Sequence, residues 1–262
     1  MQKKFQELFL NQWKKYFLES ELPIGYYYSD QIQANDLDNS RDTDRCLIGN
    51  LNRVREGYPY VYSAHSPGCS GGKRYSGYSA KLRPNFEYFL SCGIPGKVEG
   101  ERYKKTPELV QEFLKNHPPF KAPGKYLVFK RFDKFSETEE PVAYIFFAAP
   151  DVLSGLFTLA NYDRKDSNGV IAPMGSGCPS TLNYPIDESQ LADPRCVLGM
   201  FDVSARPSVP ANTLTFTIPA KKFESMVNDM DESFLITGSW KLVEQRLQST
   251  KGNQRFLLVC NR

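Results

Sequence analysis

The chain has 262 residues, of which 40% are hydrophobic and 13% aromatic, and this composition excludes a largely disordered protein. Lys and Arg number 33 against 30 Asp and Glu, and the basic residues are scattered, so no basic surface for nucleic acid is expected. No window holds the roughly 18 apolar residues of a membrane helix, so we expect a cytoplasmic protein without a membrane partner.

The first half of the chain predicts a helix and then two strands that flank a second helix. In residues 1–19 apolar side chains recur at helical spacing, and Pro23 follows, which predicts a packing helix. The segments IGYYYSD and YPYVYSA are predicted strands, and DRCLIGNLNRVREG between them predicts a helix that ends at Gly57. KTPELVQEFLKN predicts a further helix, with Thr106 as its N-cap and Pro107 at its first position.

The second half alternates strands and helices. KYLVFKRF and VAYIFFAAP are predicted strands, and because the second is apolar on both faces we expect it at the centre of a sheet. DVLSGLFTLANYD predicts a helix with Asp151 as its cap, and AKKFESMVNDM and SWKLVEQRLQS predict two more helices. GVIAP, CVLGMFDVS and TLTFTIP predict three further strands. The pattern is that of a mixed α/β fold, with an α+β arrangement as the alternative.

A weak internal similarity predicts how this fold is organised. A strand, a helix, a second strand and a glycine-flanked cysteine occur in this order before Cys69 and again before Cys178. We therefore expect one domain over residues 1–262, with two related lobes, 20–120 and 121–235, packed around a shared cleft. A helix over residues 1–19 and a helix and strand over 238–260 flank the lobes. Because ligands bind at strand ends in α/β folds, we expect Cys69 and Cys178 to face a common cavity.

Six cysteines are the main chemical feature of the sequence. No two lie within four residues of each other, unlike the paired cysteines of structural zinc sites, and in a cytoplasmic protein thiols or ligands are expected before disulfides. Glycine next to a cysteine lets backbone amides reach the sulfurs of an iron–sulfur cluster. The first hypothesis is therefore a binding or redox protein with an iron–sulfur cluster or other metal centre in a pocket. Its expected ligands are Cys69 and Cys178, with Cys46 and Cys92 as further ligands, whereas Cys196 and Cys260 fall in predicted strands as core thiols.

A second hypothesis makes Cys69 the nucleophile of an enzyme. His65 precedes Cys69 by four residues, across Pro67 and Gly68, and a tight turn could bring its imidazole to the thiol as a base. The amides around Gly71 would then bind the anion that forms during the reaction. The alternative for His65 is a ring that bonds to main-chain groups of the turn.

The third hypothesis is a metal-free pocket for a small anionic metabolite. The GCSGGKR loop lacks the spacing of a phosphate-binding P-loop, and GSGCPS matches only part of a dinucleotide-binding fingerprint. Consecutive amides beside basic side chains can still hold a carboxylate or a phosphate. The alternative is a glycine turn whose basic side chains are solvated. The residues expected to bind the ligand are Gly71, Gly72, Lys73 and Arg74, together with Gly175 and Gly177 and with Arg206 as a further anchor. Asp202, in an apolar strand, is expected to bond to Arg206 or to the main chain.

Several longer strings together carry a family resemblance. They are CLIGNLNRVREGYP, GCSGG, LSCGIPGKVEGERYKKTPELV, KYLVFKRFD, PDVLSGLFTLANYDR, GVIAPMGSGC and PRCVLGMFDVSARP, within a range from about Leu22 to Leu235. The chain resembles, in these strings, the domain of unknown function 169 family, which implies no established activity. The members of that family come largely from anaerobic bacteria and archaea, which is compatible with an oxygen-sensitive cluster or thiol. Cys69 and Cys178 fall in what look like its signature loops.

Overall fold

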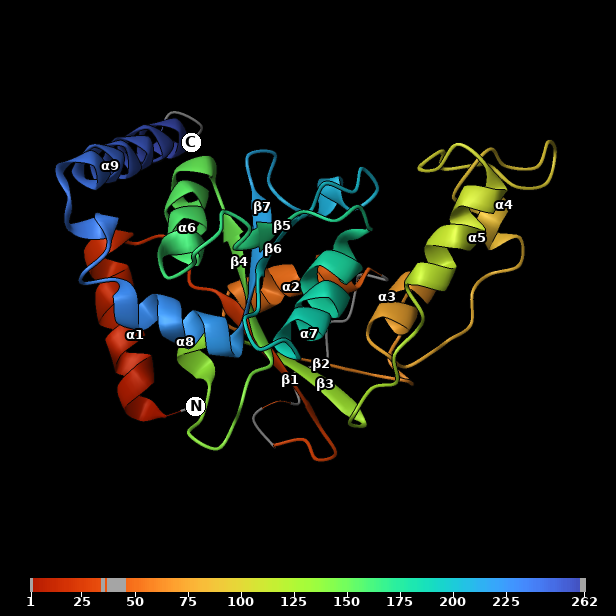
Figure 1. Cartoon of the computed structure of the whole chain (residues 1–262), viewed down its shortest axis with the longest axis horizontal. Helices are drawn as coiled ribbons and strands as arrows, with labels where there is room; N and C mark the ends of the chain where they lie inside the picture. The colour runs from red at the N-terminus through yellow and green to blue at the C-terminus, as the bar shows by residue number, and fades with distance from the viewer. Residues whose placement is uncertain (1, 34–35, 37–45, 260–262) are drawn as a thin grey trace.

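The computed structural model describes residues 2–33, Asp36 and residues 46–259. In this part of the chain seven strands form one sheet in the order β2-β3-β1-β4-β7-β6-β5 (Figure 1). Only β5 and β6 are parallel neighbours; the other adjacent pairs are antiparallel. The strands are β1 (Ile24–Ser29), β2 (Tyr60–Ser63), β3 (Tyr126–Arg131), β4 (Ala143–Ala148), β5 (Val170–Ile171), β6 (Cys196–Gly199) and β7 (Leu214–Pro219).

Strand β4 lies at the centre of this sheet, which confirms the expectation from its apolar sequence. All six of its residues are buried. Phe146 contacts the core on one face, where it lies opposite Phe216 of β7, whereas Ile145 contacts the core on the other face and lies opposite Ile24 of β1. A strand that is buried on both sides needs no polar alternation, so its sequence reads as a continuous apolar run.

Helices cover both faces of the sheet. One core cluster joins α1, α6, α8 and α9 to one face, and another joins α2 and α7 to the opposite face. The helices are α1 (Lys3–Tyr16), α2 (Leu47–Arg55), α3 (Ser70–Tyr75), α4 (Phe86–Phe89), α5 (Pro107–Asn116), α6 (Pro150–Tyr162), α7 (Tyr184–Ser189), α8 (Ala220–Asp229) and α9 (Gly238–Val259). In the part of the chain that the structure describes, none of them combines the length and apolar character needed to cross a membrane.

The helix boundaries test the capping predictions. Thr106 caps α5 as predicted, since its side chain accepts a hydrogen bond from the Leu109 amide at 3.4 Å. Asp151 does not cap α6, because Pro150 takes the first helical position and shifts the N-cap to Ala149.

The prediction of a strand near the C-terminus is wrong. Residues 238–259 form one helix, since no proline interrupts the helix-forming start of that segment. Cys260 lies outside the described residues.

The two related lobes are not confirmed. One sheet runs through both ranges, because β1 pairs directly with β4. The two helices that the internal similarity makes equivalent, α2 and α6, pack on opposite faces of that sheet. A repeated strand–helix–strand order therefore leads to two different placements here.

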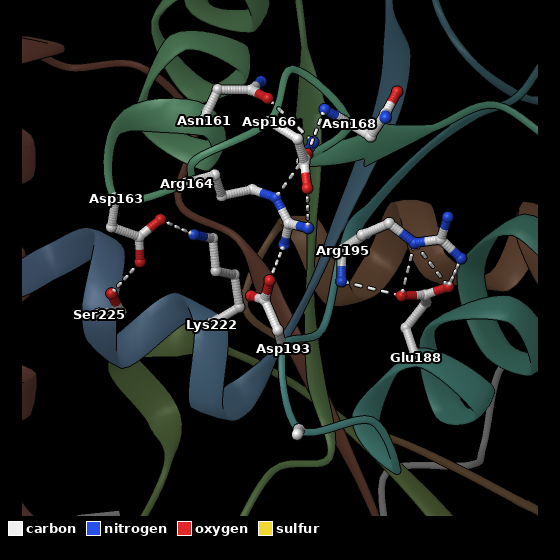
Figure 2. A network of polar contacts seen from close by, with 12 residues as sticks. Asn161, Asp163, Arg164, Asp166, Asn168, Glu188, Asp193, Arg195, Lys222 and Ser225 are labelled. Atoms are coloured by element: carbon white, nitrogen blue, oxygen red, sulfur yellow. Dashed lines mark hydrogen bonds and ion pairs between the residues drawn. The ribbon is translucent and has the colours of Figure 1, made fainter.

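A strip of ion pairs ties the loop after α6 to α8 and to the segment before β6 (Figure 2). The Arg164 guanidinium bonds to Asp193 at 2.8 Å and to Asp166 at 3.3 Å. The buried Lys222 of α8 pairs with Asp163, at the end of α6. A further pair joins Glu188 of α7 to Arg195, at 2.5 Å.

A long excursion, here called the side segment (residues 77–122), leaves the sheet between β2 and β3. A hydrogen bond from the Ala122 amide to the Gly77 carbonyl, at 2.9 Å, closes its base. The side segment contains α4 and α5, which Figure 1 shows at one end of the molecule, beyond α3. Its own main-chain bonds, such as Glu101 N–H to Phe89 O at 2.7 Å, fold it back on itself.

Candidate functional site

Three of the six cysteines begin helical segments that meet at one pocket. Cys46 is the N-cap of α2, Cys69 is the N-cap of α3, and Cys178 precedes the π-helical turn Pro179–Asn183. All three line a cavity of about 380 Å³. Cys69 and Cys178 thus face a common cavity, as expected from the placement of their two loops. Such π-helical turns occur frequently at functional sites.

The glycines of the first loop are explained by close packing against Tyr62. A Cβ atom at Gly68 would lie 2.4 Å from the hydroxyl of Tyr62, and one at Gly72 would lie 3.2 Å from it. Tyr62 is fully buried beneath the loop, so its ring cannot move aside. Gly71 differs, because a Cβ there would find only Cys69 Sγ, at 3.9 Å, beyond its chain neighbours. The bare backbone therefore serves packing at Gly68 and leaves open space in the pocket at Gly71.

The thiols differ in their surroundings. Cys69 is exposed, and its sulfur accepts a hydrogen bond from the Gly72 amide at 3.2 Å. Cys178 is only 5% exposed; burial raises the pKa of its thiol well above the ordinary value, and the nearby Cys69 and Cys46 raise it further. In the described ranges, His, Cys, Asp and Glu side chains form no group of three or more arranged to hold a metal ion.

A buried carboxylate, Asp202, joins the parts of the pocket. It is 2% exposed and accepts hydrogen bonds from the Tyr103 hydroxyl at 2.8 Å and from the Gly177 amide at 3.3 Å. The amide and hydroxyl of Ser204 bond to it as well, each at 3.0 Å. These donors compensate the buried charge, and Asp202 thereby ties the side segment to the loop that contains Gly175 and Gly177, here called the second glycine loop.

The side segment supplies the opposite wall, which is aromatic and basic. Arg83 lies over the ring of Phe89 at 4.1 Å, and Lys104 lies over Phe113 at 5.4 Å. Neither cation forms an ion pair with a carboxylate in the part of the chain that is described, although Glu101 is exposed on the same wall. The other apolar lining residues are Ile48, Tyr75, Phe86, Leu90, Met174 and Ala205.

Three of the four non-glycine residues with a positive φ in the described ranges lie near this pocket, whereas the fourth, Leu18, follows α1. Asn85, Arg102 and Met200 have φ angles of +57°, +58° and +69°, which non-glycine residues seldom adopt. Asn85 directly precedes the lining residue Phe86, and Arg102 directly precedes Tyr103. Because strained residues cluster at functional sites, this observation supports the pocket as the candidate site.

The structure places the expected anion anchors elsewhere. Lys73 donates to the Ser63 and Ala64 carbonyls at 2.6 and 3.0 Å, and Arg74 donates to the carbonyls of Ala80 and His117. Arg206 likewise bonds to the carbonyls of Thr213, Pro210 and Ala211 rather than to Asp202. These cations therefore donate hydrogen bonds to main-chain carbonyls outside the pocket wall. In contrast, Gly71, Gly72, Gly175 and Gly177 do line the pocket.

His65 and Cys92 are also outside this pocket wall. His65 is exposed and lines a separate groove of about 820 Å³, together with Tyr78 and Phe120. His65 is therefore not among the residues that line the cavity of Cys69. Cys92 is exposed in the side segment, with its sulfur 3.5 Å from the Gly93 carbonyl oxygen. Cys196 is a buried core thiol, as predicted, 3.9 Å from the Met226 sulfur.

Sequence reasoning missed the side segment as a pocket wall. Arg83, Phe86 and Phe89 stand together in RPNFEYFL, but Lys104 and Phe113 follow at some distance along the chain. Only the fold of the side segment brings them to the cysteines. The one available signal was the density of aromatic residues around α4.

Fold and pocket together define a mixed α/β protein with a cavity lined by thiols on one side and by an aromatic, basic wall on the other. The chain belongs to the domain of unknown function 169 family, described as "Uncharacterised ArCR", whose family model matches residues 16–229. No curated protein and no solved structure matched the chain.

Proposed function

We propose that the chain binds a small organic anion with an apolar or aromatic body in the pocket between α2, α3 and the side segment. The observation that carries this proposal is the pairing of a largely apolar cavity with two cations that form no ion pair with a carboxylate of the described residues. Ligand pockets of this kind combine apolar walls with a few polar groups that fix orientation.

Each wall has a role in this proposal. Arg83 and Lys104 lie over the rings of Phe89 and Phe113, contacts that leave N–H donors of both cations available to a carboxylate or another anionic group. Asp202 positions Tyr103 and the second glycine loop, and both of its oxygens are occupied by hydrogen-bond donors. Its charge is thereby compensated before a ligand arrives.

The proposal can be tested with anilinonaphthalene sulfonate, a fluorescent aromatic anion. Gly71→Trp fills the pocket without a main-chain clash, because a Cβ at this position meets only Cys69 Sγ. We expect it to weaken dye binding by at least about tenfold, which corresponds to roughly 1.4 kcal/mol. Gly238→Trp is the matched control, since a Cβ there meets nothing within 4 Å and α9 does not line the pocket. Equal binding by the two variants would contradict the proposal.

A second candidate is a thiolate-ligated iron centre or iron–sulfur cluster. It is supported by the three cysteines that share the pocket and by the Gly72 amide that donates to the sulfur of Cys69. The absence of a gathered ligand group among the described residues favours the metal-free ligand. Iron and inorganic sulfide analysis of protein purified without oxygen decides between them. Iron and sulfide bound to the native chain and lost in Cys69→Ser and Cys178→Ser would favour the cluster.

A further inference from the structure

We propose that Cys69 undergoes thiol–disulfide exchange with a small anionic disulfide that enters the pocket. This inference rests on the proposed function and names the chemical class of the ligand. The Cys69 sulfur attacks one sulfur of the disulfide R–S–S–R, the S–S bond breaks, and R–S⁻ leaves with the electron pair. The thiol proton of Cys69 passes to the solvent and R–S⁻ takes up a proton from it. The products are the mixed disulfide Cys69–S–S–R and one thiol, R–SH.

The position of Cys69 suits the first attack. The residue is exposed and lines the cavity, so an incoming disulfide can reach its sulfur. The hydrogen bond from the Gly72 amide, at 3.2 Å, holds that sulfur at the start of α3. Exchange rates depend on access as well as on the attacking thiol.

The other two thiols of the cavity do not compete equally for this step. Cys178 is buried, and burial raises the pKa of its thiol, which keeps it protonated. Cys46 is half-buried at the start of α2. The mixed disulfide is therefore expected at Cys69.

The opposite wall selects the charge of the disulfide. Arg83 and Lys104 line the same cavity as Cys69, each lies over an aromatic ring, and neither forms an ion pair with a carboxylate in the described ranges. Anionic groups attached to either sulfur would be attracted to them, which raises the local concentration of the reagent near the thiol. A neutral disulfide gains nothing from these cations.

The experiment compares two cysteines and two reagents. Cys92 is the matched control, because it is also exposed but does not line the pocket. Dithiobis(nitrobenzoate), an aromatic disulfide with two carboxylates, and neutral dithiodipyridine are reacted with the full chain, and each labelled peptide is quantified by mass spectrometry over time. We expect the ratio of the Cys69 rate to the Cys92 rate to be at least about fivefold larger for the anionic reagent.

Variants assign this difference to the pocket. The double substitution of Arg83→Gln and Lys104→Gln is expected to slow the anionic reagent at Cys69 by about fivefold and to leave the neutral reagent and Cys92 unchanged. Gly71→Trp is expected to slow both reagents at Cys69, and Gly238→Trp neither. A Cys69 that shows no preference for the anionic reagent, while the dye still binds and Gly71→Trp blocks it, overturns the exchange alone. If, in addition, Gly71→Trp and Gly238→Trp bind the dye equally well, the proposed function is overturned too.

Discussion

The ion-pair strip of Figure 2 and the pocket wall of the side segment differ in what their cations contact. In the strip, Arg164 contacts two carboxylates and Lys222 contacts Asp163. In the pocket, Arg83 and Lys104 contact aromatic rings. Carboxylates compensate the cations of the strip, which hold segments of the chain together, whereas in the proposed function the two pocket cations are available to a ligand. On the proposed function, the strip cations serve the fold and the pocket cations serve binding, so mutations at the two places should have different effects.

The largest expected effect is at Lys222. Its side chain is 3% exposed, and Lys222→Met leaves the carboxylate of Asp163 without its cation. We expect the free energy of unfolding to fall by about 3 kcal/mol, at the lower end for a broken buried pair because Asp163 is 35% exposed. Urea denaturation measures the change. The neighbouring Lys221 is exposed and bonds to the Ala192 carbonyl, so Lys221→Met is expected to change stability by less than about 0.5 kcal/mol.

The same pair predicts a pH dependence. Burial raises the pKa of Asp163, but hydrogen bonds from Lys222 and Ser225 outweigh it, so the net shift is downward from 3.8. A depressed carboxyl pKa gives stability that is present above the unfolded value and is lost as the pH falls through the folded value. The difference between wild type and Lys222→Met should therefore stay constant from about pH 7 to about pH 5 and shrink below 3.8. A difference that persists in stronger acid would contradict this account.

The next effect concerns the glycine loop at the pocket. Gly68→Ala places a Cβ 2.4 Å from the Tyr62 hydroxyl, and the ring of Tyr62 is packed between Tyr60 and Tyr78. Such overpacking is expected to lower the free energy of unfolding by about 2 kcal/mol. Combining it with Tyr62→Phe, which removes the hydroxyl, should recover part of the loss in a double-mutant cycle.

Gly71→Ala is expected to act in the other direction. The position is helical, its Cβ would meet only Cys69 Sγ at 3.9 Å, and alanine favours a helix over glycine. We expect stability to rise by about 0.5–1 kcal/mol in thermal or urea denaturation. A fall in stability would show that the loop needs glycine at Gly71 for a reason other than open space.

Local sequence signals predicted much of the sheet. The apolar run of β4 and the Thr106–Pro107 start of α5 were read correctly, because they depend on neighbouring residues alone. The prediction of Asp151 as a helix cap was wrong because the adjacent proline shifts the start of α6. The prediction of a C-terminal strand was wrong because the apolar residues there continue a helix. The common cavity of Cys69 and Cys178 was also predicted, from glycines that follow strands.

The partners of the charged residues could not be predicted in the same way. Lys73 and Arg74 stand next to the glycine loop in sequence, yet their side chains turn to main-chain carbonyls. Arg83 and Lys104 lie farther along the chain and reach the pocket only through the fold of the side segment. The sequence predicts which backbone segments lie near the glycine loop. It does not predict the direction of a long side chain, because that depends on which carbonyl or ring lies within reach in the tertiary structure.

The smallest expected effect on stability is at the pocket cations, where the comparison is sharpest. Arg83→Gln and Lys104→Gln each remove one contact to a ring, so each should lower the free energy of unfolding by no more than about 0.5 kcal/mol, as for an exposed cation–π contact. Dye affinity should nevertheless fall by about threefold for each, because the sulfonate loses a charged partner. If either cation instead stabilised the fold, its substitution would lower the free energy of unfolding and leave dye affinity unchanged. Urea denaturation and dye titration of the same two variants therefore separate the two uses of charge.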